Sequence, residues 1–566
     1  MKKENKLLVA AIVLPLLVGA FFSQDGIYKL NTMHLIVLTT LVLVYNIMLF
    51  MQRADWEYRR TVLQCSAMSF VAIGLIQGIC YLRQIDDISE TLKIWLGIAL
   101  AMVLITAFLL LLKREGGVTE NVIMIVIFAG FLLRIFYVVL TQATLYQNDT
   151  VAFHPEHQGH LGYIYQVFTH GRLPDIDPTE AYQFYHPPLY YTISAIFLRL
   201  FYLLRLLPEN SLDWDETLQV LPLAYSMMTL VFVYKIAKQM KISCEGRLIA
   251  VCFAGFLPYS IMMSGALNND SLATLFTVMC IYFTLKWYEK PDMKGILIMA
   301  LCIGCAMMTK ISTGMIAPAM AVLMLQRAWK DRKQWTVYLK QFTYFGLIAF
   351  PLGLWHSVYC YIKYRMPFQY AYYLGEDSVQ YIGFHDKWSR LFDFERAFEF
   401  LAAREDYIND FADYNIPVTL IKYAVFGESR YYQASTLTNI LGTALFWVTV
   451  ALFISMVVLF VIWCFLKDGR LMQKVFMLTG VAVSLLLYVR FCFRYTHVCT
   501  MNIRYIMSAY YIGCIVIAVT VSEIHKRIEK KSVTGGRVCK RIAIALPVLY
   551  AVAVVVQKAG MEALLF

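Results

Sequence analysis

The sequence predicts an all-α polytopic membrane protein, and three observations lead to this fold class. The chain is 60% hydrophobic and only 16% charged, whereas a soluble domain is about a quarter charged. Apolar runs long enough to cross a hydrocarbon core of about 30 Å recur along the whole chain. Basic residues gather in the short loops between these runs, as is typical of cytoplasmic loops. We therefore expect a helical bundle of about fifteen spans in a lipid bilayer.

The net charge of +12 fits this interpretation. In a soluble protein such an excess would suggest a nucleic-acid partner. Here most of the excess lies in short loops, where it orients the helices, so we expect no nucleic-acid partner.

Five spans come first, at about residues 7–22, 33–51, 61–82, 91–112 and 121–141. The N-terminal lysines place the N-terminus in the cytoplasm. We interpret residues 1–117, which hold four of these spans, as an accessory region. The fifth span opens the core, residues 118–525, and leads into a large outer loop, residues 142–216.

Residues 188–206 decide the topology. If this apolar stretch crossed the bilayer, the later basic loops would all lie outside, against the positive-inside rule. Arg199 and Arg205 would also be costly near the middle of the bilayer. Pro187 and Pro188 suit the first turn of a helix. We therefore predict a juxtamembrane helix on the outer surface.

Ten further spans follow, at about residues 217–237, 247–266, 269–287, 293–309, 312–328, 340–361, 437–466, 473–490, 504–524 and 541–558. A second large outer loop, residues 362–436, has mixed charge and many tyrosines. Residues 526–566 form a basic cytoplasmic loop and the last span, which puts the C-terminus outside.

The first outer loop concentrates the chemistry of the chain. Residues 145–191 contain several acids and five of the ten histidines, namely His154, His157, His160, His170 and His186. Within this segment, HQGHLGYIYQVFTH has apolar residues at helical spacing, which predicts an amphipathic helix lying on the membrane. His157 and His160 lie one turn apart and either share a ligand or sit among the lipid headgroups.

Asp149 follows the fifth span by a few residues, at the membrane–water boundary. A carboxylate there can accept a proton from an acceptor hydroxyl while a lipid phosphate approaches from the bilayer. The alternative is an acid at a helix end with no chemical role. Glu156 and His154, with His186, are candidates to bind a divalent metal ion, although their spacing matches no recognised metal motif.

Other polar residues are expected at the same membrane face. Asn269 and Asp270 lie in an outer turn, and Lys310 lies in another. Arg504 flanks a third outer turn, as do Arg490 and Arg494. Lysine and arginine suit the phosphate of an anionic lipid, but each can also snorkel to ordinary headgroups.

These residues carry a resemblance to a known family. Asp149, the GHLGYI helix and YHPPLYY, followed by SGALNND, MMTKISTG and MNIRYI, resemble the GT-C membrane glycosyltransferases. The nearest branch is the bacterial relatives of protein O-mannosyltransferases and lipid A aminoarabinose transferase, glycosyltransferase family 39. The similarity covers about residues 121–525.

The resemblance implies a GT-C-type bundle that moves a sugar from a polyprenyl-phosphate donor to an extracytoplasmic hydroxyl on a protein, lipid or cell-wall polymer. It implies that Asp149 is the catalytic acid or base, Asp270 a second acid, and Lys310 and Arg504 the partners of the carrier phosphate. We further expect the substrate site to include His160, Tyr185, His186 and Asn269. The family often has an acidic pair in this loop, whereas Thr150 follows Asp149 here, which weakens the case for a metal ion.

Two alternatives to a transferase remain. A transporter or flippase of a lipid-linked glycan would need charges or helix breaks near mid-span and internal symmetry, and the sequence offers few of the former and no evident repeat. An inactive relative that binds a lipid-linked glycan would not need the intact acids and bases.

Overall fold

The structure is a computed structural model, and it describes residues 3–22, 118, 120–141, 143, 158–207, 214–378, 380–395, 413–427 and 436–562. The predicted all-helical class is confirmed. Within these residues there is no strand beyond an isolated antiparallel bridge between Tyr381 and His497. Three predicted spans, residues 33–51, 61–82 and 91–112, lie outside the described part.

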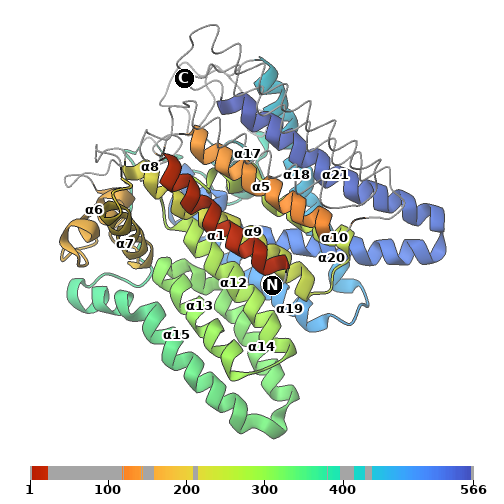
Figure 1. Cartoon of the computed structure of the whole chain (residues 1–566), viewed down its shortest axis with the longest axis horizontal. Helices are drawn as coiled ribbons and strands as arrows, with labels where there is room; N and C mark the ends of the chain where they lie inside the picture. The colour runs from red at the N-terminus through yellow and green to blue at the C-terminus, as the bar shows by residue number, and fades with distance from the viewer. Residues whose placement is uncertain are drawn as a thin grey trace.

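Each of the other twelve predicted spans contains a helix (Figure 1), although the span predicted at residues 247–266 is divided at Pro258 into α10 and the short helix α11 (Pro258–Met262). The helices of these spans are α1 (Lys3–Phe22), α5 (Glu120–Leu140), α9 (Val220–Gln239), α10 (Cys244–Phe256), α12 (Asp270–Glu289), α13 (Met293–Thr309), α14 (Ala317–Lys330), α15 (Trp335–Tyr364), α18 (Thr436–Phe465), α19 (Leu471–Arg494), α20 (Met507–Lys531) and α21 (Val533–Glu562). Among the described helices, nine are long and apolar enough to cross a membrane.

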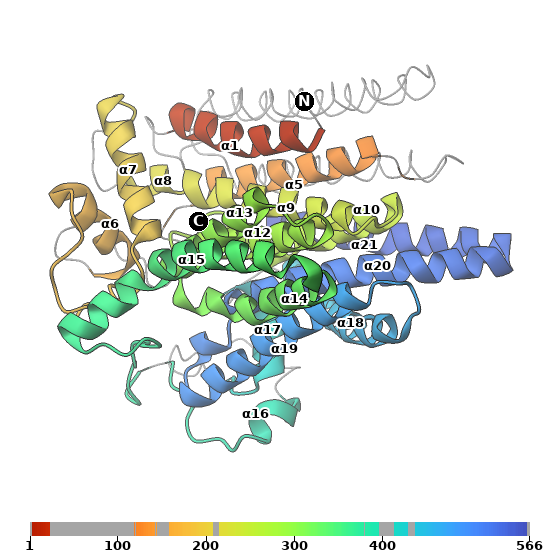
Figure 2. The same ribbon diagram turned by 90° about the horizontal axis from the view of Figure 1, so that it is seen from below.

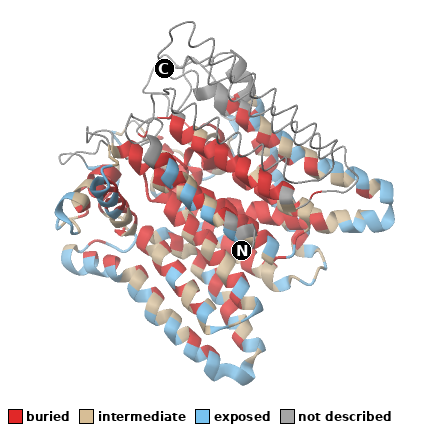
Figure 3. Cartoon of the chain, viewed as in Figure 1, coloured by how far each residue is buried: buried red, intermediate tan, exposed pale blue. Residues whose placement is uncertain are grey.

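The bundle has a buried centre and an apolar exterior. In the most apolar segments of α5 and α20, 89% of the residues are buried, whereas in those of α15 and α18 only 28% are buried. Figure 3 shows the same contrast between the central helices and α15. The exposed residues of α18 include Ile454, Val457 and Val461. An apolar surface of this extent is typical of a lipid-facing exterior, and the chain is a membrane protein.

Two helices lie across one end of the bundle. In Figures 1 and 2, α6 (Gly159–His170) and α7 (Leu189–Leu203) sit at the same end, and α7 runs across the direction of α1 and α5. Residues 188–206 thus contain a 15-residue helix, α7, with Ile196 and Leu203 exposed on one face and Leu198 buried on the other. This arrangement fits a helix lying in a membrane interface.

Arg134 fills a helix break inside the bundle. α10 ends before Pro258, which begins the short helix α11 (Pro258–Met262). A proline removes one backbone donor, and a helix end frees further carbonyls. The Arg134 guanidinium donates to the Gly255 carbonyl at 2.7 Å, and the Ser260 hydroxyl donates to the Ala254 carbonyl at 3.3 Å. The break leads directly into the turn that carries Asp270.

Residues 362–436, the second predicted outer loop, contain a helix that the sequence did not lead us to expect. α17 (Ile416–Phe426) begins at Asn415, whose side chain accepts a hydrogen bond from the Val418 amide. Its residues are largely buried, and it packs against α18 and α11. A shorter helix, α16 (Ser389–Phe392), precedes it.

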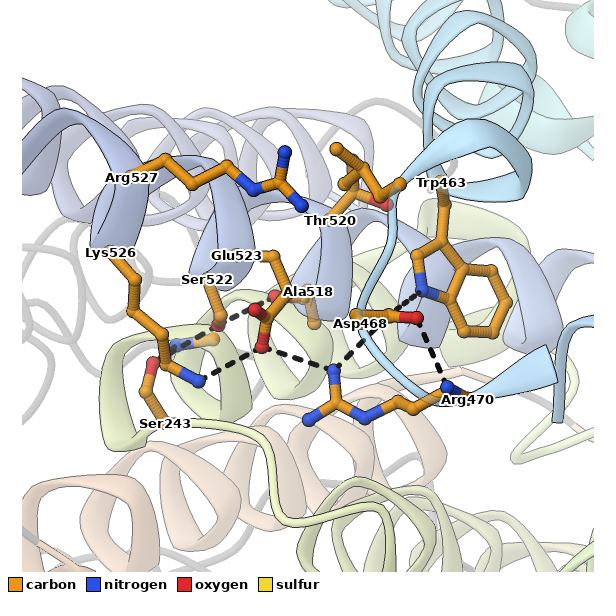
Figure 4. Close-up of polar contacts among 12 residues, drawn as sticks. Ser243, Trp463, Asp468, Arg470, Ala518, Thr520, Ser522, Glu523, Lys526 and Arg527 are labelled. Atoms are coloured by element: carbon orange, nitrogen blue, oxygen red, sulfur yellow. Dashed lines mark hydrogen bonds and ion pairs between the residues drawn. The ribbon is translucent and has the colours of Figure 1, made fainter.

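The opposite end of the bundle is closed by a polar cluster (Figure 4). In the turn between α18 and α19, Asp468 accepts a hydrogen bond from the Trp463 indole and pairs with Lys474, each at 2.9 Å. Arg470 pairs with Glu523 of α20 at 3.1 Å. The Ser243 hydroxyl, which caps α10, lies 3.0 Å from the Ser522 hydroxyl of α20. These contacts fix α10, α18, α19 and α20 to one another.

Candidate active site

Asp270 is the first residue of α12 and is held by its neighbours. The Asp270 amide donates to the Asn268 side chain at 3.0 Å. The Asn269 side-chain amide donates to the Thr309 carbonyl at 3.0 Å, which fixes the start of α12 beside the end of α13. A carboxylate at a helix N-terminus is also favoured by the helix dipole.

Two cations converge on this carboxylate from different parts of the chain. Lys310, which follows the last residue of α13, forms an ion pair with Asp270. The guanidinium of Arg504, in the 3-10 turn η7 (Ile503–Ile506), lies 3.9 Å from the other carboxylate oxygen. The Tyr505 ring lies against both, with the lysine nitrogen 4.9 Å and the guanidinium carbon 5.2 Å from its centroid. All three charged side chains are at most 13% exposed, so water screens their charges weakly.

A small pocket opens beside these three residues. Its volume is about 30 Å³, which is room for a water molecule or part of a phosphate group rather than a sugar. The lining is rich in hydroxyl groups around the two cations. Its hydroxyl-bearing residues are Thr274, Thr277, Ser312, Thr313, Tyr505 and Ser508.

A layer of stacked rings from α6 and the start of α7 adjoins the charged residues. His160 lies 2.8 Å from the Tyr191 hydroxyl through its Nδ1 and stacks on His186 with ring centroids 5.8 Å apart. Desolvation lowers the pKa of His186 well below its usual value, and the charges of Lys310 and Arg504 lower it further. His186 is therefore neutral near pH 7 and can accept a hydrogen bond.

The start of the second outer loop packs on the end of the first. Asp175 forms an ion pair with Lys363 at the end of α15. The hydrogen bonds from Lys363 and Tyr364 lower the pKa of the Asp175 carboxyl. Tyr185 meets the Tyr370 ring edge-to-face at 5.5 Å. The second loop thus lies over the residues that lead to His186.

The same loop also contacts the segment before Arg504. The Ile382 amide donates to the Thr496 carbonyl at 3.1 Å, and the Val498 amide donates to the Gln380 carbonyl at 3.0 Å. The Asn502 side chain then accepts from the Arg504 amide at 2.9 Å, which sets the start of η7.

The sequence-predicted residues fall into three groups. Asp270, Lys310 and Arg504 meet at one pocket, although they are up to 234 positions apart in the chain, and Asn269 holds the start of α12 beside it. The residues of the first loop, His160, Tyr185 and His186, form the adjoining layer.

The third group, Asp149, His154 and Glu156, lies outside the described residues. Their predicted roles in catalysis and metal binding stay predictions. Within the described part of the chain, no group of three His, Cys, Asp or Glu side chains is arranged to hold a metal ion.

Sequence reasoning missed two residues of this region and one that is buried in the bundle. Tyr191 and Tyr505 each belong to a motif that was recognised, YHPPLYY and MNIRYI, and each follows a predicted residue closely. Arg134 had the clearest signal, because it is a lone charge in the apolar run GFLLRIFYVV, and charges inside spans are rare and mark structural or functional positions.

The comparisons with known proteins bear on this region directly. Residues 185–355 match the family described as dolichyl-phosphate-mannose-protein mannosyltransferase, a family of GT-C glycosyltransferases. The match runs from Tyr185 into α15 and includes His186, Asp270 and Lys310, whereas Arg504 lies beyond it.

A comparison with curated proteins found no match. Among solved structures, the oligosaccharyltransferase of Archaeoglobus fulgidus in its apo form is similar, with a TM-score of 0.45 at 14% identity. The similarity covers 78% of this chain and 56% of that one, so the chain spans little more than half the length of that enzyme. The match to residues 185–355 confirms the resemblance of this membrane protein to the GT-C glycosyltransferases.

Proposed function

We propose that the chain is a membrane glycosyltransferase that moves a sugar from a polyprenyl-phosphate donor to an extracytoplasmic acceptor hydroxyl. The observation that supports this most is the meeting of Asp270, Lys310 and Arg504 at a hydroxyl-lined pocket at one end of an apolar bundle. The name of the matched family describes transfer of mannose from a lipid phosphate to protein, and the donor class that we propose follows it.

The charges of the pocket suit a lipid phosphate. Two cations and one carboxylate leave a net charge of +1, which balances the single charge of a sugar–phosphodiester. As the bond between the sugar and the phosphate breaks, negative charge grows on the leaving phosphate. Lys310 and Arg504 can stabilise this developing charge because they are buried and already oriented.

Asp270 has a different role in this proposal. A carboxylate engaged by two cations is a weak base, so it suits positioning of Lys310 and Arg504 better than removal of a proton. Without it, the two buried cations would repel each other. Proton removal from the acceptor is assigned to Asp149, by the resemblance and by its position after α5.

We place the site on the extracytoplasmic side, because two short turns rich in basic residues lie at the other end of the bundle. The turn between α14 and α15 and the turn between α18 and α19 both lie there. Their basic residues, with those of α20, are Arg327, Lys330, Arg332, Lys333, Lys467, Arg470, Lys474, Lys526, Arg527, Lys530 and Lys531. By the positive-inside rule this end faces the cytoplasm.

The test uses membranes that contain the full chain and a panel of radiolabelled polyprenyl-phosphate sugars. Transfer is measured as label that leaves the lipid and appears in an acceptor fraction. We expect Asp149→Asn and Asp149→Ala to lower transfer at least about 100-fold, the usual contribution of a general base. Lys310→Ala should weaken donor binding, because a charge-assisted contact to phosphate is lost.

Asp175→Asn is the matched control, because this aspartate lies in the same outer loop but pairs with Lys363 at the surface. It should retain transfer. Full activity in both Asp149 variants would remove the base assignment. If the wild-type chain moved a lipid-linked glycan from one leaflet of a liposome membrane to the other and transferred no sugar, the result would show a flippase instead of a transferase.

A further inference from the structure

An exposed aromatic surface lies in the second outer loop, apart from the candidate active site. Three aromatic side chains around α16 are largely open to solvent, with exposed fractions of 96% for Phe384, 72% for Trp388 and 61% for Phe392. The Trp388 and Phe392 rings stack with centroids 5.6 Å apart. We call these three residues the α16 surface.

The backbone that carries the α16 surface is firmly held. Arg390, only 2% exposed, points in the opposite sense and donates to the Cys492 carbonyl of α19 at 2.7 Å. The Asp386 carboxylate accepts from the Trp388 amide at 2.8 Å and from the Ser389 amide at 3.1 Å. The aromatic rings are therefore presented by a fixed turn, and their exposure is not that of a loose loop.

The turn that carries the α16 surface packs beside the lipid-facing side of α19. Lys387 and Arg390 lie over the Phe493 ring, at 5.9 and 5.6 Å from its centroid. Phe493 is seven residues after Leu486, so both lie on the same helix face. Leu486 is 70% exposed, and on a membrane-spanning helix such a face meets lipid. Figure 2 shows α16 at the edge of the molecule, beside α19.

We propose that Phe384, Trp388 and Phe392 dock into the bilayer interface at the end of the bundle that carries the candidate active site. Aromatic side chains, tryptophan above all, favour this depth, and Lys387 can reach the headgroups from it. The partner is a lipid surface, and the inference does not depend on glycosyl transfer.

The docked turn would also fix the segment before Arg504 relative to the bilayer. Besides Cys492, Arg390 contacts the Met501 sulfur at 3.7 Å, and Met501 lies three residues before Arg504. A lipid-docked α16 surface thus sets the depth of one of the two cations that face the pocket.

Fluorescence quenching in liposomes of brominated phosphatidylcholine tests this inference on the full chain. The chain has ten tryptophans, so the emission of Trp388 is obtained as the difference between wild type and Trp388→Phe. We expect bromine near the interface to quench this difference signal about as strongly as that of Trp355, which is 43% exposed on the lipid-facing helix α15. The Trp355 signal comes from Trp355→Phe in the same way.

Trp287, 1% exposed and packed between α12 and α15, supplies the buried reference through Trp287→Phe. Quenching of Trp388 no greater than that of Trp287 would overturn the proposal. Quenching by aqueous iodide in place of bromolipid would overturn it too and point to a water-soluble partner. Because Trp388→Phe keeps an aromatic ring at this position, the variant used to obtain the Trp388 emission still has the α16 surface.

Discussion

At the scale of single residues, Arg134 is the most constrained charge in the described bundle. Its guanidinium donates to Ser226 at 2.8 Å, Gly130 at 3.0 Å, Gly255 at 2.7 Å and Ser260 at 3.0 Å. It thereby joins α5, α9, α10 and α11 around the helix break. This buried arginine, whose partners are all neutral, supplies hydrogen-bond donors to carbonyl groups that the helix break leaves free.

We predict that Arg134→Met lowers the free energy of unfolding by about 3 kcal/mol or more, because each buried acceptor left without a donor costs about 1–3 kcal/mol. The free energy of unfolding of Arg134→Lys should lie between those of Arg134→Met and wild type, since an ammonium group reaches fewer acceptors than a guanidinium. The measurement is the thermal unfolding midpoint of the protein in detergent. Arg332→Met, exposed in the turn between α14 and α15, is the control and should change little; equal midpoints for wild type and Arg134→Met would contradict this role of Arg134.

The residue scale also shows what the sequence could predict of the site. Lys310, Arg490, Arg494 and Arg504 were all expected at one membrane face, because each lies at the end of a span. The structure brings Lys310 and Arg504 to Asp270, whereas Arg494 packs on the Tyr495 ring. Local hydropathy predicts the depth of a cationic residue in the membrane. It does not predict the direction in which the side chain leaves the helix, because that depends on how the helices pack.

At the scale of elements, close helix contact depends on particular glycines. Gly246 lies in the first turn of α10 against α20, and a Cβ there would stand 2.8 Å from the Ala518 carbonyl oxygen. A backbone atom cannot turn aside as a side chain can. Small residues of this kind let membrane helices approach closely.

We predict that Gly246→Ala lowers the free energy of unfolding by about 1–3 kcal/mol, because α10 and α20 must separate. Gly346→Ala is the matched control. It lies inside α15, and its nearest atoms beyond the helix backbone are those of Phe350, at an ordinary 3.6 Å. The control should be neutral or slightly stabilising, as alanine favours helix. A greater loss of thermal stability in Gly346→Ala than in Gly246→Ala would show the packing argument to be wrong.

The elements themselves were predictable to different degrees. The described spans were found because about twenty apolar residues in a row signal a span without any tertiary information. α17 was missed because its apolar run has only 11 residues and lies between polar segments, too short to be recognised as a span. Its helix is stabilised by packing against α11 and α18, which hydropathy does not report.

At the scale of the whole molecule, the two ends of the bundle differ in charge and chemistry. Two glycines in open turns mark these ends. Gly171, the C-cap of α6, and Gly469, in the turn between α18 and α19, have φ of 64° and 75°. No atom lies within 4 Å of a Cβ built at either, so each turn can accept an inserted peptide.

We predict that an epitope tag inserted after Gly171 is reached by antibody on intact cells, and that a tag after Gly469 is reached only after the membrane is permeabilised. The reason is that Gly469 lies among the basic residues of the end that we propose to be cytoplasmic. Each tagged protein serves as the control for the other, provided that both are present in the membrane at equal amounts. Access to both tags on intact cells would refute the orientation.

The bridge between Tyr381 and His497 has a consequence for the order of events in a reaction. It joins the outermost loop to the short stretch that ends in Arg504, and His497 is further fixed by the Gly375 carbonyl at 2.8 Å. On the proposed function, an acceptor that displaces that loop would also move the segment before Arg504, which we assign to the donor phosphate. We therefore expect binding of the acceptor to change the affinity of the chain for the donor.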